Sequence, residues 1–213
     1  MNGAWMPFSR YLFNTLVITL TGTVGHILLA SLCAYSLSKI PFPGSGAVFQ
    51  IIVLSLMFSP VVTTVPTYII MSKIGLVDTL WAVILPALQS SLGLYLIKQF
   101  LDTLPDTLLE AARIDGAGEM RLFLRIVMPN LKPAWLTLGI LSIQSLWNIV
   151  SPYTYSEELK TLPQALSQIV SAGISRSGVG SAVALLMIVV PIFCFVIAQG
   201  NIIQTMSTSG MKD

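Results

Sequence analysis

Five long apolar runs, none of them alternating with polar residues, constrain the fold of this chain more than any other feature. They cover residues 12–37, 47–71, 80–100, 133–150 and 181–205. A helix needs about 20 apolar residues to cross a bilayer, and runs that do not alternate favour helices over the strands of a membrane barrel. With 54% hydrophobic and only 9% charged residues, the chain cannot cover its surface with charge. The sequence predicts an all-α integral membrane protein, a polytopic bundle of five spans.

Prolines interrupt three of these runs. Pro60 and Pro66 lie in the second run, Pro86 in the third and Pro191 in the fifth. Each proline removes a backbone donor and is expected to kink its helix. The segment 58–66 also carries three hydroxyl side chains, so it predicts either a bent helix that lines a polar pathway or a helix kinked for packing alone.

The charges are concentrated in one internal segment. Residues 98–132 carry half of the formal charges of the chain. If the C-terminus is cytoplasmic, seven of the eleven basic residues lie on the inner side, as the positive-inside rule favours. This orientation makes 1–11 an external N-terminal segment, 101–132 a cytoplasmic loop, 151–180 an external loop and 206–213 a cytoplasmic tail. The net charge of +2 is too small to suggest a nucleic-acid partner.

The cytoplasmic loop has the pattern of two short helices joined by a glycine turn. Pro105 and the acidic residues around it suit a helix start. Gly116 and Gly118 can end this helix in a left-handed turn, and a second helix is expected from Met120 until Pro129 stops it. Small residues at Ala111 and Ala112 would let another protein approach closely. The loop is either a docking site or an amphipathic helix that lies on the membrane.

The external loop is long enough to suggest a role of its own. It begins near Tyr153, includes a short helix expected from Pro163, and ends in a glycine- and serine-rich stretch. Contact with an external partner and a passive lid over the bundle are both compatible with this pattern. The candidates for contact are Tyr153, Glu157, Glu158 and Arg176.

The cytoplasmic loop resembles the coupling motif of permease subunits in binding-protein-dependent ABC importers. That motif reads Glu-Ala-Ala, three residues, Gly, nine residues, Ile, any residue, Leu, Pro. Six positions match in register, and Met128 replaces the leucine; the matches are Glu110, Ala111, Ala112, Gly116, Ile126 and Pro129. Arg113 and Asp115, between the alanines and the glycine, follow the wording of the carbohydrate branch, which includes the smaller maltose-transporter permease.

The resemblance implies a fold, partners and a mode of energy coupling. The fold is that of a type I importer permease, usually with six spans, of which the first is not visible here. The coupling segment would sit in a cleft of a cytoplasmic ABC ATPase dimer, with Glu110 touching the ATPase and Gly116 providing the turn. A second permease subunit, expected to be a different chain, and an external solute-binding protein complete the assembly in the cell membrane. The chain itself would bind no cofactor, because ATP is used by the ATPase subunits.

A sugar path needs hydroxyl-matching polar groups and aromatic faces with little charge. Candidates occur on the second, third and fourth runs, although packing explains each of them equally well. They are Ser59, Thr63, Thr64, Tyr68, Gln89, Ser90, Tyr95, Gln144, Trp147 and Asn148.

Other chemistry finds little support in the sequence. The Gly-x-x-x-x-Gly-Lys-Ser/Thr phosphate loop does not occur, and no cluster has metal-ligand spacing. His26 is expected to form a hydrogen bond between helices, and Cys33 and Cys194 to be small buried hydrophobic residues. A permease for a non-sugar solute is the main alternative. A membrane-embedded enzyme would need an intramembrane catalytic pair, which is not visible.

Overall fold

The computed structural model describes residues 6–40, 42–171, 173 and 177–209, and these residues form helices and loops without a β-strand. The helices are α1 (Phe8–Lys39), α2 (Ser45–Ser55), α3 (Pro60–Lys73), α4 (Trp81–Leu88), α5 (Ser91–Asp102), α6 (Asp106–Ile114), α7 (Glu119–Leu122), a π-helical turn η1 (Phe123–Val127), α8 (Met128–Asn130), α9 (Lys132–Trp147), a 3-10 turn η2 (Glu157–Leu159), α10 (Leu162–Ser171) and α11 (Ser177–Ser209). The expectation of an all-helical protein is confirmed for the described residues.

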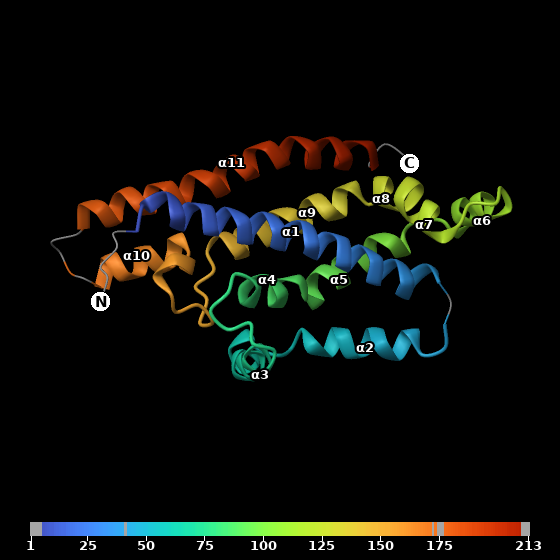
Figure 1. Ribbon diagram of the computed structural model, residues 1–213. Helices are drawn as coiled ribbons and strands as arrows, with labels where there is room; N and C mark the ends of the chain where they lie inside the picture. Colours follow the sequence, from blue (N-terminus) through green and yellow to red (C-terminus); the bar gives the residue numbers. More distant parts are fainter. Residues whose placement is uncertain (1–5, 41, 172, 174–176, 210–213) are drawn as a thin grey trace.

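Helix α1 is the centre of the bundle. It packs against α4, α5 and α9 along its length, and α11 lies along α9. Figure 1 shows α6 and α7 at one end of this bundle and α10 at the other. Small residues permit the close approach of these helices. A Cβ added to Gly22 would lie 2.7 Å from Leu146 Cδ1, and one added to Gly25 would lie 2.5 Å from Leu88 Cδ2.

Two helices of the described chain are long and apolar enough to cross a membrane by themselves. They are Phe8–Lys39 and the combined segment Trp81–Asp102. A third span results if the bent pair Glu119–Asn130 and Lys132–Trp147, which turns by 75°, is taken as one. The structure therefore supports a membrane protein with several spans without fixing the number five.

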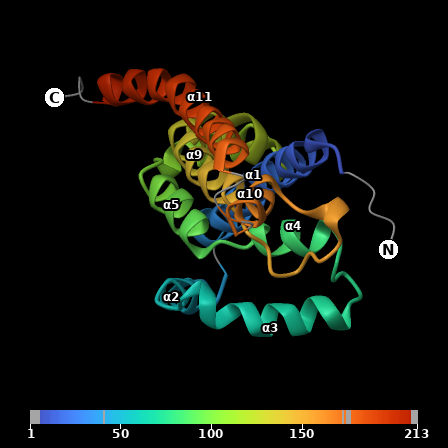
Figure 2. The same ribbon diagram turned by 90° about the vertical axis from the view of Figure 1, so that its left-hand side faces the viewer.

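The second apolar run does not form the continuous helix expected over 47–71. The chain leaves the helix after Ser55, and Pro60 begins α3 with Ser59 as its N-cap, so Pro60 starts a helix instead of kinking one. Figures 1 and 2 show that α3 crosses the direction of α2. Neither helix enters the core: α2 has no buried residue, and among the α3 side chains that the structure describes only Met71 is buried.

His26 forms the interhelical hydrogen bond that the sequence predicts. Its Nδ1 lies 2.9 Å from Ser142 Oγ of α9, and the side chain is buried. Cys33, in contrast, is exposed, which corrects the expectation of burial. An apolar run does not show which of its residues face the core, and Cys33 lies on the side of α1 that faces away from the other helices. The side chain of Cys194 lies outside the described part of the chain.

Gly93 fits against His26 so closely that a methyl group there has no room. A Cβ at this position would overlap His26 Nε2 and lie 2.6 Å from its Cε1. We expect Gly93→Ala to destabilise the bundle by about 1–3 kcal/mol, the usual cost of overpacking, measured by thermal unfolding in detergent. Gly46→Ala in α2 is the control, because nothing lies within 4 Å of its added Cβ. Equal stability of the two variants would contradict the packing at Gly93.

Candidate docking surfaces at the two ends of the bundle

The charged segment 101–132, which we call the docking loop, begins with the predicted helix and glycine turn. Pro105 is the N-cap of α6, with Asp106 in the first turn near the positive end of the helix dipole. Gly116 has a φ of 79°, a left-handed conformation that favours glycine. Gly118 is extended and precedes α7. The local pattern of helix, glycine turn and helix is therefore present.

The second half of the docking loop differs from the expectation. Pro129 does not stop the helix, which passes through η1 and continues to Asn130. A proline inside a helix lacks an N–H and crowds the carbonyl one turn earlier. The π-helical turn Phe123–Val127 ends two residues before Pro129 and includes Arg125, the residue whose carbonyl a proline at 129 would crowd.

The docking loop has one buried face and one exposed face. Leu109, Leu122, Phe123 and Val127 are at most 3% exposed and join the core with α1 and α5. The opposite face carries Glu110, Ala111, Asp115, Gly116 and Pro129. It also presents apolar side chains, and these are Leu108, Ile114, Met120 and Leu124. Ile114 is 86% exposed. Apolar side chains on a charged loop are typical of a surface that another molecule covers.

Arg113 of the matched motif extends toward α1, and its side chain remains 37% exposed. Its Nε lies 2.8 Å from Glu119 Oε1, and its Nη2 donates to the carbonyl of Lys39 at 3.4 Å. Glu119 also accepts a hydrogen bond from the Tyr35 hydroxyl at 2.5 Å. The Arg113 guanidinium, followed by the Tyr35 hydroxyl, lowers the pKa of Glu119 below its usual range. Ala112 and Ile126 are half-buried against the same core.

The candidates for a substrate path do not meet at one place. Trp147, 1% exposed, is a core residue whose indole donates to the Met187 carbonyl at 2.9 Å, which corrects its assignment to a path. Gln144 of α9 and Asn148, which follows the last residue of α9, are exposed. Gln144 lines a small, mostly apolar cavity of about 240 Å³ between α9 and α11. Its other lining residues are Ile140, Ile143, Pro191, Ile192 and Phe195.

The remaining path candidates lie in or next to α3 and α5. Ser59 and Ser90 cap α3 and α5, and Tyr95 stacks on Phe49 with ring centroids 6.1 Å apart. Gln89 is exposed between α4 and α5, and Thr63 and Thr64 lie on α3. Tyr68 of α3 stacks on Tyr153 of the external loop at 6.4 Å. This contact joins Tyr68, predicted to line the substrate path, to Tyr153, predicted to contact the external partner.

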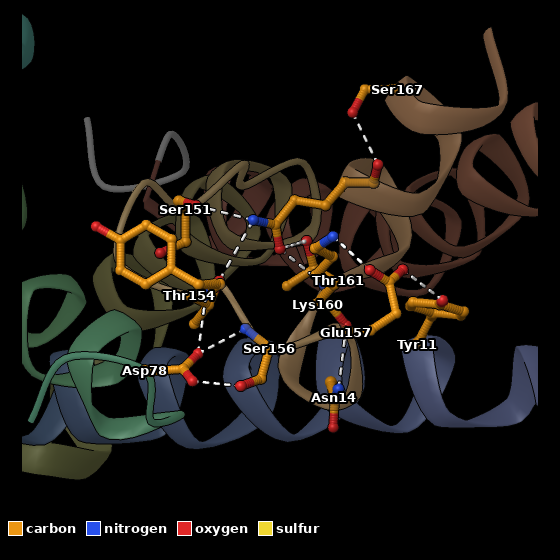
Figure 3. A network of polar contacts seen from close by, with 12 residues as sticks. Tyr11, Asn14, Asp78, Ser151, Thr154, Ser156, Glu157, Lys160, Thr161 and Ser167 are labelled. Carbon is orange, nitrogen blue, oxygen red and sulfur yellow. Dashed lines mark hydrogen bonds and ion pairs between the residues drawn. The ribbon is translucent and has the colours of Figure 1, made fainter. Parts of the chain in front are cut away.

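The first part of the external loop, residues 151–161, is fixed to the N-terminal end of α1 (Figure 3). Tyr11 donates to the Glu157 carboxylate at 2.8 Å, and Asn14 donates to the carbonyls of Glu158 and Lys160 at 2.8 and 3.0 Å. The Gln164 side chain holds the loop from within, because it bonds Ser151, Thr154 and Thr161. The Glu157 carboxylate is thus occupied internally, while the Glu158 side chain is exposed. Arg176 lies outside the described residues.

Asp78 is an anchor of this loop that sequence reasoning missed. It adopts a φ of 61°, and its carboxylate accepts from the amides of Tyr155 and Ser156 at 2.8 Å each and from the Ser156 hydroxyl. These bonds, first the one from the Ser156 hydroxyl, lower the pKa of Asp78. The one hint in the sequence is that an aspartate, which tolerates the left-handed backbone region, follows shortly after a glycine, a pattern typical of a turn.

We expect Asp78→Ala to loosen residues 153–156. The variant loses charge-assisted hydrogen bonds and places alanine at positive φ, which should lower the local stability of this segment by about 1–2 kcal/mol. Amide hydrogen exchange in these residues should therefore be roughly ten-fold faster. Because the carboxylate pKa is lowered in the folded chain, this anchoring is present above the ordinary pKa near 4 and is lost as the pH falls through the lowered value. Asp78→Asn, which tolerates this φ and keeps one acceptor, is the matched control. Unchanged exchange in Asp78→Ala would contradict the anchor.

Comparison with known proteins identifies a family. Residues 26–208 match the model of the binding-protein-dependent transport system inner membrane component. The sn-glycerol-3-phosphate transport system permease protein UgpE of Yersinia enterocolitica is 39% identical over 142 residues, which are 67% of this chain and 50% of that protein. The polygalacturonan/rhamnogalacturonan transport system permease protein YtcP of Bacillus subtilis is 32% identical over 65% of this chain and 51% of its own length. The chain thus spans about half the length of these curated relatives.

A solved structure shares the fold. It is a bacterial ABC transporter involved in the import of the acidic polysaccharide alginate; one of its chains superposes with a TM-score of 0.82 and 23% identity, over 91% of this chain and 74% of that chain. At this identity the likeness concerns the fold alone. Because the family model covers most of its length, the chain belongs to the family of binding-protein-dependent transport system inner membrane components.

Proposed function

We propose that this chain is the permease subunit of an ATP-driven ABC importer and forms half of the path for a sugar or oligosaccharide. The observation that carries the proposal is the docking loop, in which Glu110 and Ile114 lie on an exposed face at one end of the bundle. A membrane component with this surface is suited to bind a soluble protein. The family match adds that the transport system depends on a binding protein.

The docking loop would bind the cytoplasmic ABC ATPase dimer, which supplies the energy. This chain has no phosphate loop in its sequence, so we assign ATP hydrolysis to the ATPase and no enzymatic activity to the permease. Glu110 and Gly116 would contact or shape this interface, as would Ala111. Arg113 is assigned elsewhere, because its side chain faces α1.

The opposite end of the bundle would face the external solute-binding protein. Tyr155 is 58% exposed there, next to the exposed Glu158. We place both on the partner-facing side of the loop and regard Tyr153 and Glu157 as residues that shape it. Helices α2 and α3, which are almost unburied, would be covered by a second permease subunit and by lipid.

The proposed topology has five spans with a cytoplasmic C-terminus. The described end of α11 lies toward the same end of the bundle as the docking loop, and α10 lies at the other (Figure 1). This arrangement supports 101–132 and 206–213 on the cytoplasmic side and 1–11 and 151–180 on the external side. The broken segment α2–α3 would count as the second span.

A sugar is proposed as the solute because one relative is named for transport of polygalacturonan or rhamnogalacturonan, while another is named for transport of sn-glycerol-3-phosphate. The second name makes a small phosphorylated polyol the chief alternative. Gln144 in the cavity between α9 and α11 is the path candidate best placed to meet a hydroxyl group.

Uptake by the reconstituted transporter tests this function. The chain would be assembled in proteoliposomes with its second permease, ATPase and binding protein, and offered labelled mono- and oligosaccharides and sn-glycerol-3-phosphate. We expect ATP-dependent accumulation of a saccharide. If only sn-glycerol-3-phosphate accumulates, the chain is part of an importer, but its solute is not a sugar. If no solute accumulates in an ATP-dependent way, the proposed import function is contradicted.

A further inference from the structure

The end of α1 near the docking loop is held by a group of polar contacts that no part of the matched motif explains. We call this group the inner clasp, and it consists of Tyr35, Lys39, Asp106, Arg113 and Glu119. Arg113 pairs with Glu119 at 2.8 Å, and Tyr35 bonds the same carboxylate. Lys39 pairs with Asp106 at 2.7 Å and donates to the Leu104 carbonyl at 2.7 Å.

The inner clasp ties both helices of the docking loop to one helix of the bundle. Lys39 reaches the start of α6, while Tyr35 reaches the start of α7 through Glu119. Arg113, at the end of α6, bridges Glu119 to the last carbonyl of α1. The Lys39 side chain is only 5% exposed, so this ion pair is partly shielded from water. Movement of the docking loop therefore requires α1 to follow or the clasp to break.

We infer that the inner clasp is a set of positioning residues that joins the docking loop to α1, so that the ATPase and α1 move together. This inference rests on the proposed function and assigns the Arg113 side chain, which is 37% exposed, to contacts with α1 and α7 instead of the ATPase interface. Arg113 acts through Glu119 and Lys39, whose contacts set the orientation of the exposed face with Glu110 and Ile114.

Helix α1 is suited to carry movement between the two ends of the protein. It has 32 residues, contains no proline, and at 1.5 Å per residue is about 48 Å long. Its other end is bound to the external loop, where Tyr11 and Asn14 hold residues 157–160 and Thr15 accepts from the Leu162 amide at 2.8 Å. One unbroken helix thus contacts both proposed docking surfaces.

A double-mutant cycle on Arg113 and Glu119 tests the inference. The variants Arg113→Gln, Glu119→Gln and the double variant would be assembled with the ATPase and the other subunits in proteoliposomes. The measured quantities are solute molecules imported per ATP hydrolysed and the amount of ATPase that co-purifies. Lys73→Gln removes an exposed cation at the end of α3, outside the docking loop, and is the control. Tyr35→Phe removes a single hydroxyl and covers the case in which the charge variants fold poorly.

We expect each single variant to lower the import-to-ATP ratio by about five-fold or more, the range of a typical coupling energy, while the ATPase still co-purifies. The double variant should be no worse than the single ones, because the two side chains act as a unit. Tyr35→Phe should lower the ratio less, and Lys73→Gln should not change it.

Three results would overturn the inference. If Arg113→Gln alone releases the ATPase, Arg113 contacts the ATPase directly. If the losses of the two single variants multiply in the double one, Arg113 and Glu119 do not act as a unit. If all the clasp variants keep the wild-type ratio, the clasp has no positioning role. Failure of the proposed function is distinguishable from all three, because the unmutated transporter would then show no ATP-dependent uptake.

Discussion

Glu110→Lys is expected to abolish solute uptake while the protein remains in the membrane. Glu110 lies on the exposed face of α6, and the described contacts assign its side chain no partner within the chain. A lysine at a site that meets a cation of the ATPase would bring like charges together, which costs several kcal/mol. We expect binding of the ATPase to weaken by about 100-fold or more. Affinity measured in nanodiscs and uptake in proteoliposomes check this.

Glu110→Gln separates the charge from the shape of this residue. It keeps the side-chain volume and should reduce ATPase binding less than the lysine variant does. Membrane extraction and thermal unfolding of both variants should match the wild type, because Glu110 is exposed. Normal transport by Glu110→Lys would contradict the role of the docking loop in coupling.

Ile114→Asp should weaken the association with the ATPase by about 30-fold or more, since centrally buried interface residues contribute 2 kcal/mol or more. Ile114 is 86% exposed at the end of α6, next to the turn at Gly116, and an isolated chain gains nothing from this exposure. Co-purification and titration of the ATPase subunit measure the effect.

A comparable substitution at the far end of the bundle is the control. Val170→Asp places an acid on an exposed residue of α10 and should leave ATPase binding unchanged. The alternative interpretation, a helix that lies on the membrane surface, predicts another outcome. In that case Ile114→Asp would reduce contact of the loop with lipid, measured by fluorescence quenching, and ATPase affinity would stay the same.

The features that sequence predicted well are local ones. The helix after Pro105 and the turn at Gly116 depend on nearby residues and on the conformational preference of glycine, and both are present. The bond from His26 to Ser142 was expected as an interhelical contact, but its partner was not predictable. The resemblance to the family motif implied that Glu110 touches another protein. This requires an exposed side chain, and Glu110 is exposed.

The features that sequence missed depend on contacts between distant segments. Arg113 lies within the matched motif, yet its direction is set by Tyr35 and Glu119, which nothing in the spacing connects. Trp147 carries an aromatic face suited to a sugar, but α11 covers it and accepts its N–H. A proline such as Pro60 can kink a helix or begin one. Here the chain leaves α2 before Pro60, so Pro60 begins α3.

The most direct test of the central claim is hydrogen–deuterium exchange of the permease in nanodiscs with and without the purified ATPase subunit. We predict slower exchange in residues 105–130 when the ATPase is added, no change in residues 151–161, and no protection in the Glu110→Lys variant. Exchange in 105–130 that is the same at saturating ATPase as in its absence would contradict the assignment of this loop as the docking site.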